Sequence, residues 1–119
     1  MFVADIEKNI NVSRLFDYYS ALLSDRQREV VNLYYNDDLS LGEISDLIGI
    51  TRQGVRDAIK KGETLLYGYE VKLGFAARTE AVTEAADNLL DALGPREKEL
   101  SADIAVLSEK LKSVVQYQL

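Results

Sequence analysis

The side chains best suited to bind a ligand are four basic residues gathered in one short stretch. Arg52, Arg56, Lys60 and Lys61 share this stretch with a single acid, Asp57. The local charge is therefore +4 − 1 = +3, whereas the whole 119-residue chain carries −6. An acidic protein repels a phosphate backbone unless its basic residues are gathered in one place. The stretch therefore indicates contact with nucleic acid.

The types of these residues suit the major groove of a duplex. Arg binds guanine in a bidentate manner and Gln does the same with adenine, while a Thr at a helix N-terminus holds phosphate. The residues predicted to face nucleic acid are Thr51, Arg52, Gln53, Arg56, Lys60 and Lys61. Asp57 argues against base reading, because among bases it accepts only from cytosine. Two alternatives remain open, an ordinary solvated helix face and a protein-binding scaffold.

Other kinds of chemistry have few residues to support them. The chain contains no Cys and no His, which excludes disulfides, thiolate nucleophiles, Cys-based zinc sites and a histidine proton shuttle. The segment Lys61-Gly62-Glu63-Thr64 lacks the glycine and lysine pattern of a phosphate-binding loop. We expect no catalytic residues, no metal and no cofactor, and therefore no enzyme.

The N-terminal residues MFVADIEKNI lack the basic flank and long apolar core of a secretion signal. No apolar run approaches the roughly 20 residues that cross a bilayer. These features predict a cytoplasmic protein without a membrane span.

The basic stretch belongs to a predicted helix-turn-helix over residues 41–60. Ser40 and Glu43 form the signature of a capped helix start, and Ile44, Ser45 and Ile48 follow on its inner face. The next two residues, Gly49 and Ile50, make the turn. Thr51 then caps the second helix, which Val55 and Ala58 anchor. The second helix would thus present the basic residues outward.

Residues 1–75 are predicted to form one helix-turn-helix domain. Apolar residues from Val12 to Leu23 recur every three or four positions, and Ser24 and Gln27 begin another capped helix. Residues 2–10 would add a loose turn. The buried face of the long last helix is predicted to be Val55, Ala58, Ile59, Gly62, Leu66, Tyr69 and Leu73. The short helix before it would run through Ile44, Leu47 and Ile48. No strand pattern occurs, so the predicted fold class is all-α.

Residues 76–119 are predicted to form a helical extension that Gly94-Pro95 divides in two. Its second helix carries apolar residues in a four-three rhythm, the pattern of a coiled-coil seam. This seam is Leu100, Ile104, Leu107, Leu111 and Val114. Three alternatives stay open for the extension: an antiparallel hairpin, a homodimer contact, or a tail that orders only on a partner.

Two stretches carry a resemblance to known proteins, LYYNDDLSLGEIS at 33–45 and GITRQGVRDAIKK at 49–61. Residues 24–66 resemble the fourth region of bacterial sigma factors. The longer stretch 11–75 is similar to the YlxM-type family of helix-turn-helix proteins. That resemblance implies a small bacterial protein encoded beside the signal recognition particle genes, which acts in or regulates that pathway. The tail after Phe75 matches no pattern that we can name.

Two functions compete on these grounds. The first is a non-catalytic regulatory adaptor that binds the signal recognition particle protein, its RNA, or both. The second is a dimeric transcriptional regulator that reads duplex DNA with two recognition helices, whose half-sites would lie about one helical turn apart.

Overall fold

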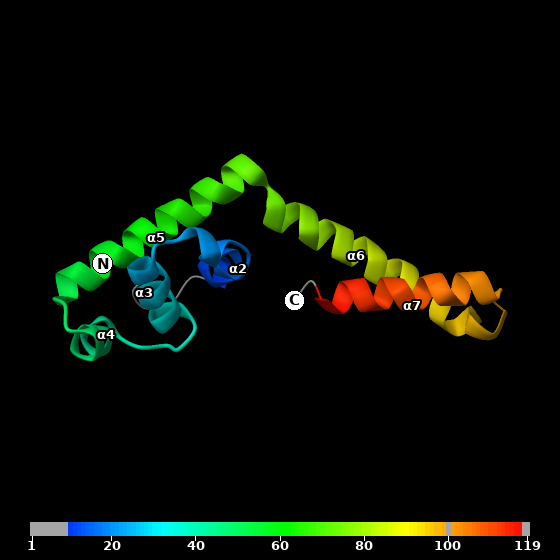
Figure 1. The fold of residues 1–119 in the computed structure, drawn as a ribbon, viewed down its shortest axis with the longest axis horizontal. Helices are drawn as coiled ribbons and strands as arrows, with labels where there is room; N and C mark the ends of the chain where they lie inside the picture. Colours follow the sequence, from blue (N-terminus) through cyan, green and yellow to red (C-terminus); the bar gives the residue numbers. More distant parts are fainter. Residues whose placement is uncertain (1–9, 100, 118–119) are drawn as a thin grey trace. The chain divides into compact units, whose positions relative to one another are not determined.

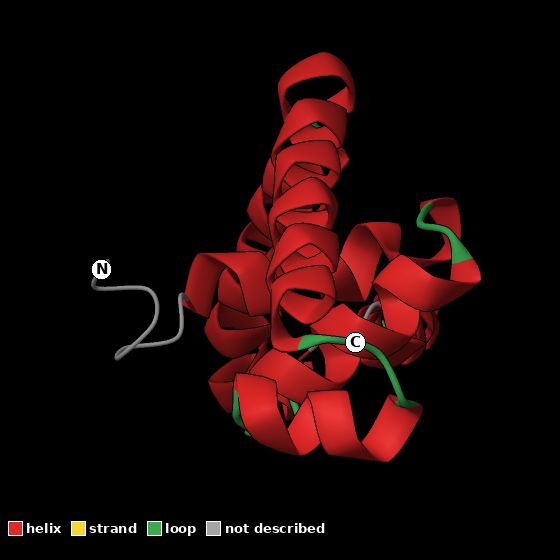
Figure 2. Ribbon diagram, turned by 90° about the vertical axis from the view of Figure 1, so that its left-hand side faces the viewer, coloured by secondary structure: helices red, strands yellow, loops and turns green. Residues whose placement is uncertain are grey.

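The computed structural model describes residues 10–99 and 101–117, which fold into helices (Figure 1). They belong to two compact units, one ending at Gly74 and the other beginning at Phe75. No strand occurs in the described ranges, and Figure 2 draws helices joined by short loops there. The all-α fold class predicted from the sequence is confirmed. The loose turn expected over residues 2–10 lies almost wholly outside the described residues.

The first unit is a bundle built around one long helix. Its elements are α2 (Ile10–Tyr19), a 3₁₀ turn η1 (Ser20–Leu22), α3 (Asp25–Tyr35), α4 (Leu41–Ile48) and α5 (Arg52–Leu73). Each of α2, α3 and α4 packs against α5. The long helix therefore supplies a common wall for three shorter ones.

The helix starts follow the capping residues that the sequence predicts. Ser24 accepts a hydrogen bond from the Gln27 backbone at 3.2 Å, and the Gln27 side chain accepts from the Ser24 backbone at 3.1 Å. Ser40 and Glu43 make the same reciprocal pair, at 3.1 and 2.9 Å. Such a box satisfies two backbone N–H groups that the first helical turn leaves without a partner. Both predicted capping boxes are confirmed.

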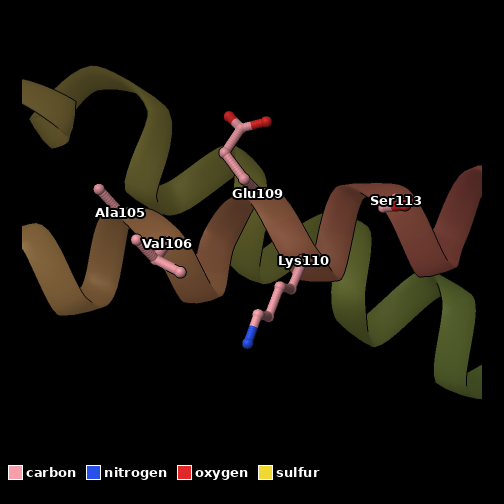
Figure 3. Close-up of a pocket in the computed structure, with 5 residues that line it drawn as sticks. All are labelled: Ala105, Val106, Glu109, Lys110 and Ser113. Atoms are coloured by element: carbon pink, nitrogen blue, oxygen red, sulfur yellow. The ribbon is translucent and has the colours of Figure 1, made fainter.

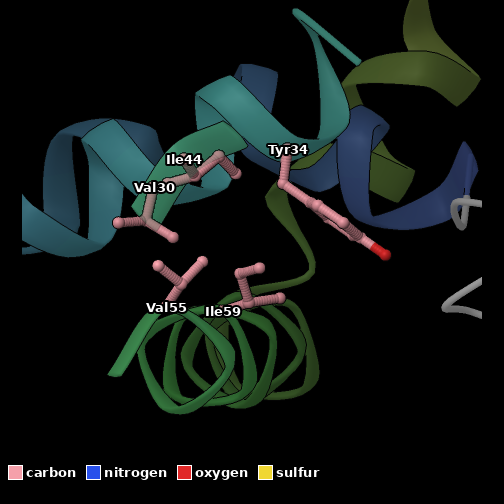
Figure 4. Close-up of a cluster of buried hydrophobic side chains, with 5 residues drawn as sticks. All are labelled: Val30, Tyr34, Ile44, Val55 and Ile59. Carbon is pink, nitrogen blue, oxygen red and sulfur yellow. The ribbon is translucent and has the colours of Figure 1, made fainter. Parts of the chain in front are cut away.

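One cluster of buried side chains holds the helix-turn-helix together. Figure 4 shows Val30, Tyr34 and Ile44 facing Val55 and Ile59 of α5. Val30, Ile44 and Val55 are fully buried. Burying an aliphatic side chain of this size contributes about 1.5–3 kcal/mol, so the cluster fixes α3 and α4 on α5.

Two large apolar side chains of this unit are exposed, and one of them, Leu73, was predicted to be buried. Leu47 of α4 is 64% exposed, and Leu73 at the end of α5 is 51% exposed. Leu47 follows Asp46 on the outer side of α4, while Ile44 alone of this helix is fully buried. The buried side chains of α5 are Val55, Ile59, Gly62 and Leu66, so the buried face ends two turns before the helix does.

The second unit is a pair of helices joined by a 3₁₀ segment. It consists of α6 (Phe75–Leu93), η2 (Gly94–Glu99) and α7 (Ala102–Tyr117). The first residues of α6 and the last turns of α7 line one groove, so the two helices run antiparallel (Figure 1). Among the described residues of this unit, only Ala76 and Ala86 are buried. The hairpin therefore has almost no core of its own.

Within residues 10–99 and 101–117, no helix is both long enough and apolar enough to span a membrane.

Candidate nucleic-acid interface

A tight turn sets the angle between α4 and α5. Gly49 ends α4 with φ +75°, a left-handed conformation that a residue with a side chain adopts at a cost. The hydroxyl of Ser45 donates to the carbonyl of Ile50 at 2.5 Å and thereby holds the turn against α4. The turn leads directly into α5, whose first residues follow at Arg52.

Thr51 and Arg52 lie at the start of α5. The Thr51 hydroxyl accepts a hydrogen bond from the Gly54 backbone at 2.9 Å, so Thr51 is the cap that the sequence predicts. The Arg52 guanidinium lies beside Gly42 of α4, where an added Cβ would be 2.9 Å from Nη2. Both side chains are exposed. The absent side chain at Gly42 leaves the room that the guanidinium occupies.

Three of the predicted basic residues form a stripe along α5. Arg52, Arg56 and Lys60 recur every four residues, which places them nearly in line on a helix of 3.6 residues per turn. We call these three residues the basic stripe. Gln53 and Asp57 lie beside it, and the Gln53 amide donates to the Asp57 carboxylate at 2.9 Å.

Lys61 departs from the basic stripe, because one residue along a helix is a rotation of about 100°. It lines a shallow hollow together with Lys60, Thr64, Leu65 and Gln27 of α3. Sequence reasoning missed Gln27 and Thr64 as members of this surface. Nothing in the spacing of residues could have found Gln27, because α3 reaches α5 only through the packing of the two helices.

One half-buried polar pair lies between α3 and α5. The Tyr35 hydroxyl donates to the Glu63 carboxylate at 2.6 Å. Burial of the phenol, then its hydrogen bond to Glu63 and the negative charge of that carboxylate, raise the pKa of Tyr35 far above its usual range. The ring also meets Tyr34 edge to face, with centroids 5.0 Å apart. Tyr35 therefore has a structural role, because it joins α3 to α5 through Glu63.

In the described part of the chain, no three Asp, Glu, Cys or His residues are grouped so as to hold a metal ion. The polar residues brought together on α5 are instead cations, an amide and one carboxylate, which suits binding to a phosphate-bearing or acidic surface.

These features define a helix-turn-helix protein: a capped short helix, a left-handed glycine turn and a longer helix that carries the basic stripe. The family model described as "Putative helix-turn-helix protein, YlxM / p13 like" (UPF0122) matches residues 6–105. The chain belongs to this family, as its resemblance predicted.

Curated relatives agree with this assignment. A UPF0122 protein of Thermoanaerobacter sp. strain X514 is 41% identical over 98 residues, which cover 82% of this chain and 84% of the relative. A UPF0122 protein of Streptococcus pyogenes serotype M5 (strain Manfredo) is 39% identical over 108 residues, 91% of this chain and 95% of the relative.

Proposed function

We propose that this protein is a non-catalytic regulatory adaptor of the signal recognition particle pathway. In this proposal the basic stripe contacts phosphates of the particle's RNA, and the acidic remainder of the chain meets its basic RNA-binding protein. The pathway comes from the resemblance of residues 11–75 to the YlxM-type family. The contact surface comes from the position of the basic stripe on α5.

The observation that carries this proposal is the concentration of positive charge on one exposed helix of an acidic chain. Phosphate contacts give affinity without sequence preference. The hydrogen bond between Gln53 and Asp57 engages the amide that would otherwise read adenine. It therefore favours contact with phosphates over direct reading of bases.

The alternative is a dimeric, sequence-specific DNA-binding transcriptional regulator. The exposed N-terminus of α5 favours it, since recognition helices of this class contact base edges with their first residues. In this case Arg52→Ala and Gln53→Ala would change the preferred sequence, whereas Lys60→Ala would weaken all duplexes alike.

The test compares two variants with equal net charge. One reverses the basic stripe (R52E/R56E/K60E), and the control reverses three exposed cations elsewhere (R26E/K72E/R96E). Binding of purified full-length protein is measured to the signal recognition particle RNA, to its protein, and to a pool of duplex DNA. Each titration is repeated over a range of salt concentrations.

We expect the wild type and the control variant to bind the particle's RNA or protein, and the stripe variant to lose that binding. For RNA, each lost phosphate contact lowers the slope of log K against log salt by about 0.7–0.9, hence by roughly 2–3 for three residues. Equal weakening in both variants would mean that bulk charge, and not the basic stripe, drives binding. Enrichment of one duplex sequence, with no binding to the particle, would support the alternative.

A further inference from the structure

The segment that leads into α5 is acidic. Residues 29–51 contain five acids and no lysine or arginine. Asp37 and Asp38 lie in the loop before α4, Glu43 and Asp46 lie on α4 itself, and all four are exposed. The first helix of the helix-turn-helix therefore presents negative charge, whereas the second carries the basic stripe.

The acids of α4 lie close to the start of the basic stripe. An added Cβ at Gly42 would be 2.9 Å from Nη2 of Arg52, so the Gly42 side of α4 faces this guanidinium. Asp46 follows Gly42 by four residues, which is about 40° around the helix, and therefore shares that side. A ligand that covers both helices would meet the carboxylates of α4 together with the basic stripe.

A duplex bound in the manner of a helix-turn-helix covers both helices. The second helix lies in the major groove, while the first crosses the sugar-phosphate backbone. In this protein the first helix is α4, so Glu43 and Asp46 would lie against phosphates and repel them. An RNA duplex meets a further obstacle, because its major groove is too deep and narrow for side chains to read. The two helices together therefore disfavour a duplex.

The helix α5 by itself offers a row of cations to one strand. Arg52, Arg56 and Lys60 are about 6 Å apart along the helix axis, since each of four residues rises by 1.5 Å. An unpaired strand is flexible, and its phosphates can follow a row of cations on one helix. Such a strand has no second backbone that must cross α4.

Two acids of α5 lie near the basic stripe, and both accept hydrogen bonds within the protein. The Asp57 carboxylate accepts from the Gln53 amide at 2.9 Å, and the Glu63 carboxylate accepts from the Tyr35 hydroxyl at 2.6 Å. From residue 52 to residue 61 the charge is +3, even with Asp57 included. The surface of α5 thus keeps an excess of positive charge that α4 lacks.

A shallow hollow at the end of the basic stripe can take an unpaired nucleoside. Its lining consists of Gln27, Lys60, Lys61, Thr64 and Leu65. The Gln27 carbonyl oxygen accepts from the Ser24 backbone at 3.1 Å, which leaves the amide NH₂ group to donate to a ligand. Leu65 adds apolar surface for a base. Bases of a duplex are paired within the stack and do not reach such a hollow, whereas bases of a single strand can be splayed out.

The second unit has no comparable row of cations in its described part. Its basic residues are nowhere three or four positions apart: Arg78, Arg96, Lys98, Lys110 and Lys112. Arg96 pairs with Glu99 at 3.4 Å, and Lys112 pairs with Glu109 at 3.3 Å. Figure 3 shows Glu109 and Lys110 pointing in opposite directions from α7. Positive charge in this unit is therefore dispersed among acids.

The apolar seam predicted for α7 adds nothing to a phosphate-binding surface, and it is used only in part between the helices. Leu111 and Val114 line a groove with residues of α6. Ile104 and Leu107 are 42% and 62% exposed, and Leu100 lies outside the described residues. Only part of the four-three pattern is therefore used within the hairpin.

We propose that the basic stripe binds an unpaired RNA strand in preference to a duplex. Phosphates of the strand contact the three cations, and one base occupies the hollow beside Gln27 and Leu65. The acids of α4 provide the selectivity, because they repel the backbone of a duplex that spans both helices. This inference rests on the proposed function, which assigns RNA to the basic stripe, and it adds the form of RNA that is bound.

The test uses three probes of equal length. The first is a fluorescently labelled oligouridylate of about 15 nucleotides, within the range of strand lengths that one binding module covers. The second is the same strand annealed to oligoadenylate, and the third carries ribose phosphates without bases. Binding of each probe to the full-length protein is measured by fluorescence anisotropy.

Two variants with the same change in charge separate the acids of α4 from bulk charge. The variant E43Q/D46N neutralises α4 and keeps a residue at position 43 that completes a capping box. The control E84Q/D87N neutralises an exposed Glu and an exposed Asp at the same spacing on α6.

We expect the wild type to bind the free strand at least roughly tenfold more tightly than the duplex. The probe without bases should bind more weakly than the free strand. E43Q/D46N should strengthen duplex binding by roughly tenfold and strand binding by no more than about twofold, because only the duplex covers α4. E84Q/D87N should change the binding of strand and duplex alike.

Equal affinity of the wild type for strand and duplex, no binding of the free strand, or equal gains from the two variants would overturn the inference. Equal affinity for the free strand and the probe without bases would overturn the assignment of a base to the hollow. A protein that binds the signal recognition particle RNA through the basic stripe but prefers the duplex here would retain the proposed function and lose this inference.

Discussion

Gly62 is the position at which one added methyl group should test the close packing of α5 against α3. It is buried in the middle of α5, and a Cβ at this position would lie 2.6 Å from Cγ2 of Val31 on α3. Carbon atoms in contact prefer about 3.5–4.0 Å, so Gly62→Ala creates an overlap of roughly 1 Å. Val31 is fully buried and branched at Cβ, which leaves it few rotamers by which to move away.

Two effects of opposite sign determine the expected stability of Gly62→Ala. Alanine gains about 1 kcal/mol over glycine in a helix interior. Overpacking of a rigid core costs typically about 1–3 kcal/mol, and an overlap with a branched, immobile side chain belongs at the upper end. We expect a net loss of roughly 1–2 kcal/mol in the free energy of unfolding. The loss arises because α3 must move away from α5.

Gly68 is the matched control, because it lies in the same helix and has no atom within 4 Å of an added Cβ. Gly68→Ala should therefore raise the free energy of unfolding by about 0.5–1 kcal/mol. Urea unfolding, followed by circular dichroism, measures both variants. The two should differ by roughly 2–3 kcal/mol although their chemical change is identical.

A double variant tests the assigned cause. Val31→Ala alone should cost roughly 2 kcal/mol through the volume it vacates, but in Gly62→Ala that volume accommodates the new methyl group. We expect the double variant to be at least about 1 kcal/mol more stable than the sum of the single effects. The reasoning is refuted if Gly62→Ala is as stable as Gly68→Ala, or if the effects of Gly62→Ala and Val31→Ala simply add.

Three further predictions follow from local contacts. Ser40→Ala should cost about 1 kcal/mol of unfolding free energy in a urea titration, because α4 loses its cap. The pKa of Tyr35 is higher in the folded protein than in the unfolded chain, where it is about 10. Its contribution to the free energy of unfolding is therefore complete below about pH 10 and is lost as the pH rises further. Between pH 9 and 11.5 the free energy of unfolding should therefore fall less steeply with pH in Tyr35→Phe than in the wild type. An unchanged slope would contradict the stabilising hydrogen bond between Tyr35 and Glu63. Gly42→Ala, in contrast to Gly62→Ala, should be neutral or stabilising by thermal denaturation, since the Arg52 guanidinium that it meets ends a flexible side chain.

The boundaries of the helix-turn-helix could be predicted from sequence because they depend on short-range chemistry. Ser24 with Gln27 and Ser40 with Glu43 satisfy backbone groups three residues away, and Gly49 takes a conformation that its own lack of a side chain permits. Such interactions need no knowledge of distant parts of the chain. The same holds for Thr51, whose cap starts α5 where predicted.

The burial of particular side chains was harder to predict, because apolar periodicity marks the residues suited to burial without saying which of them a neighbour covers. Leu47 and Leu73 fit their helical patterns but have no neighbour that buries them. The site shows the same division. Arg52, Arg56 and Lys60 form a stripe through helical spacing alone, whereas Gln27 joins Lys61 only because α3 packs on α5.

The sequence by itself determined the all-α class, the helix starts and the concentration of charge on α5, because each depends on residue type and on neighbours within one or two turns. Only the tertiary structure decided the close approach of Gly62 to Val31 and the hydrogen bond between Tyr35 and Glu63. It also decided the division of the α7 apolar residues between a contact with α6 and an exposed face. The physical reason is that packing joins residues far apart in the chain, and steric fit selects which of several suitable side chains become buried.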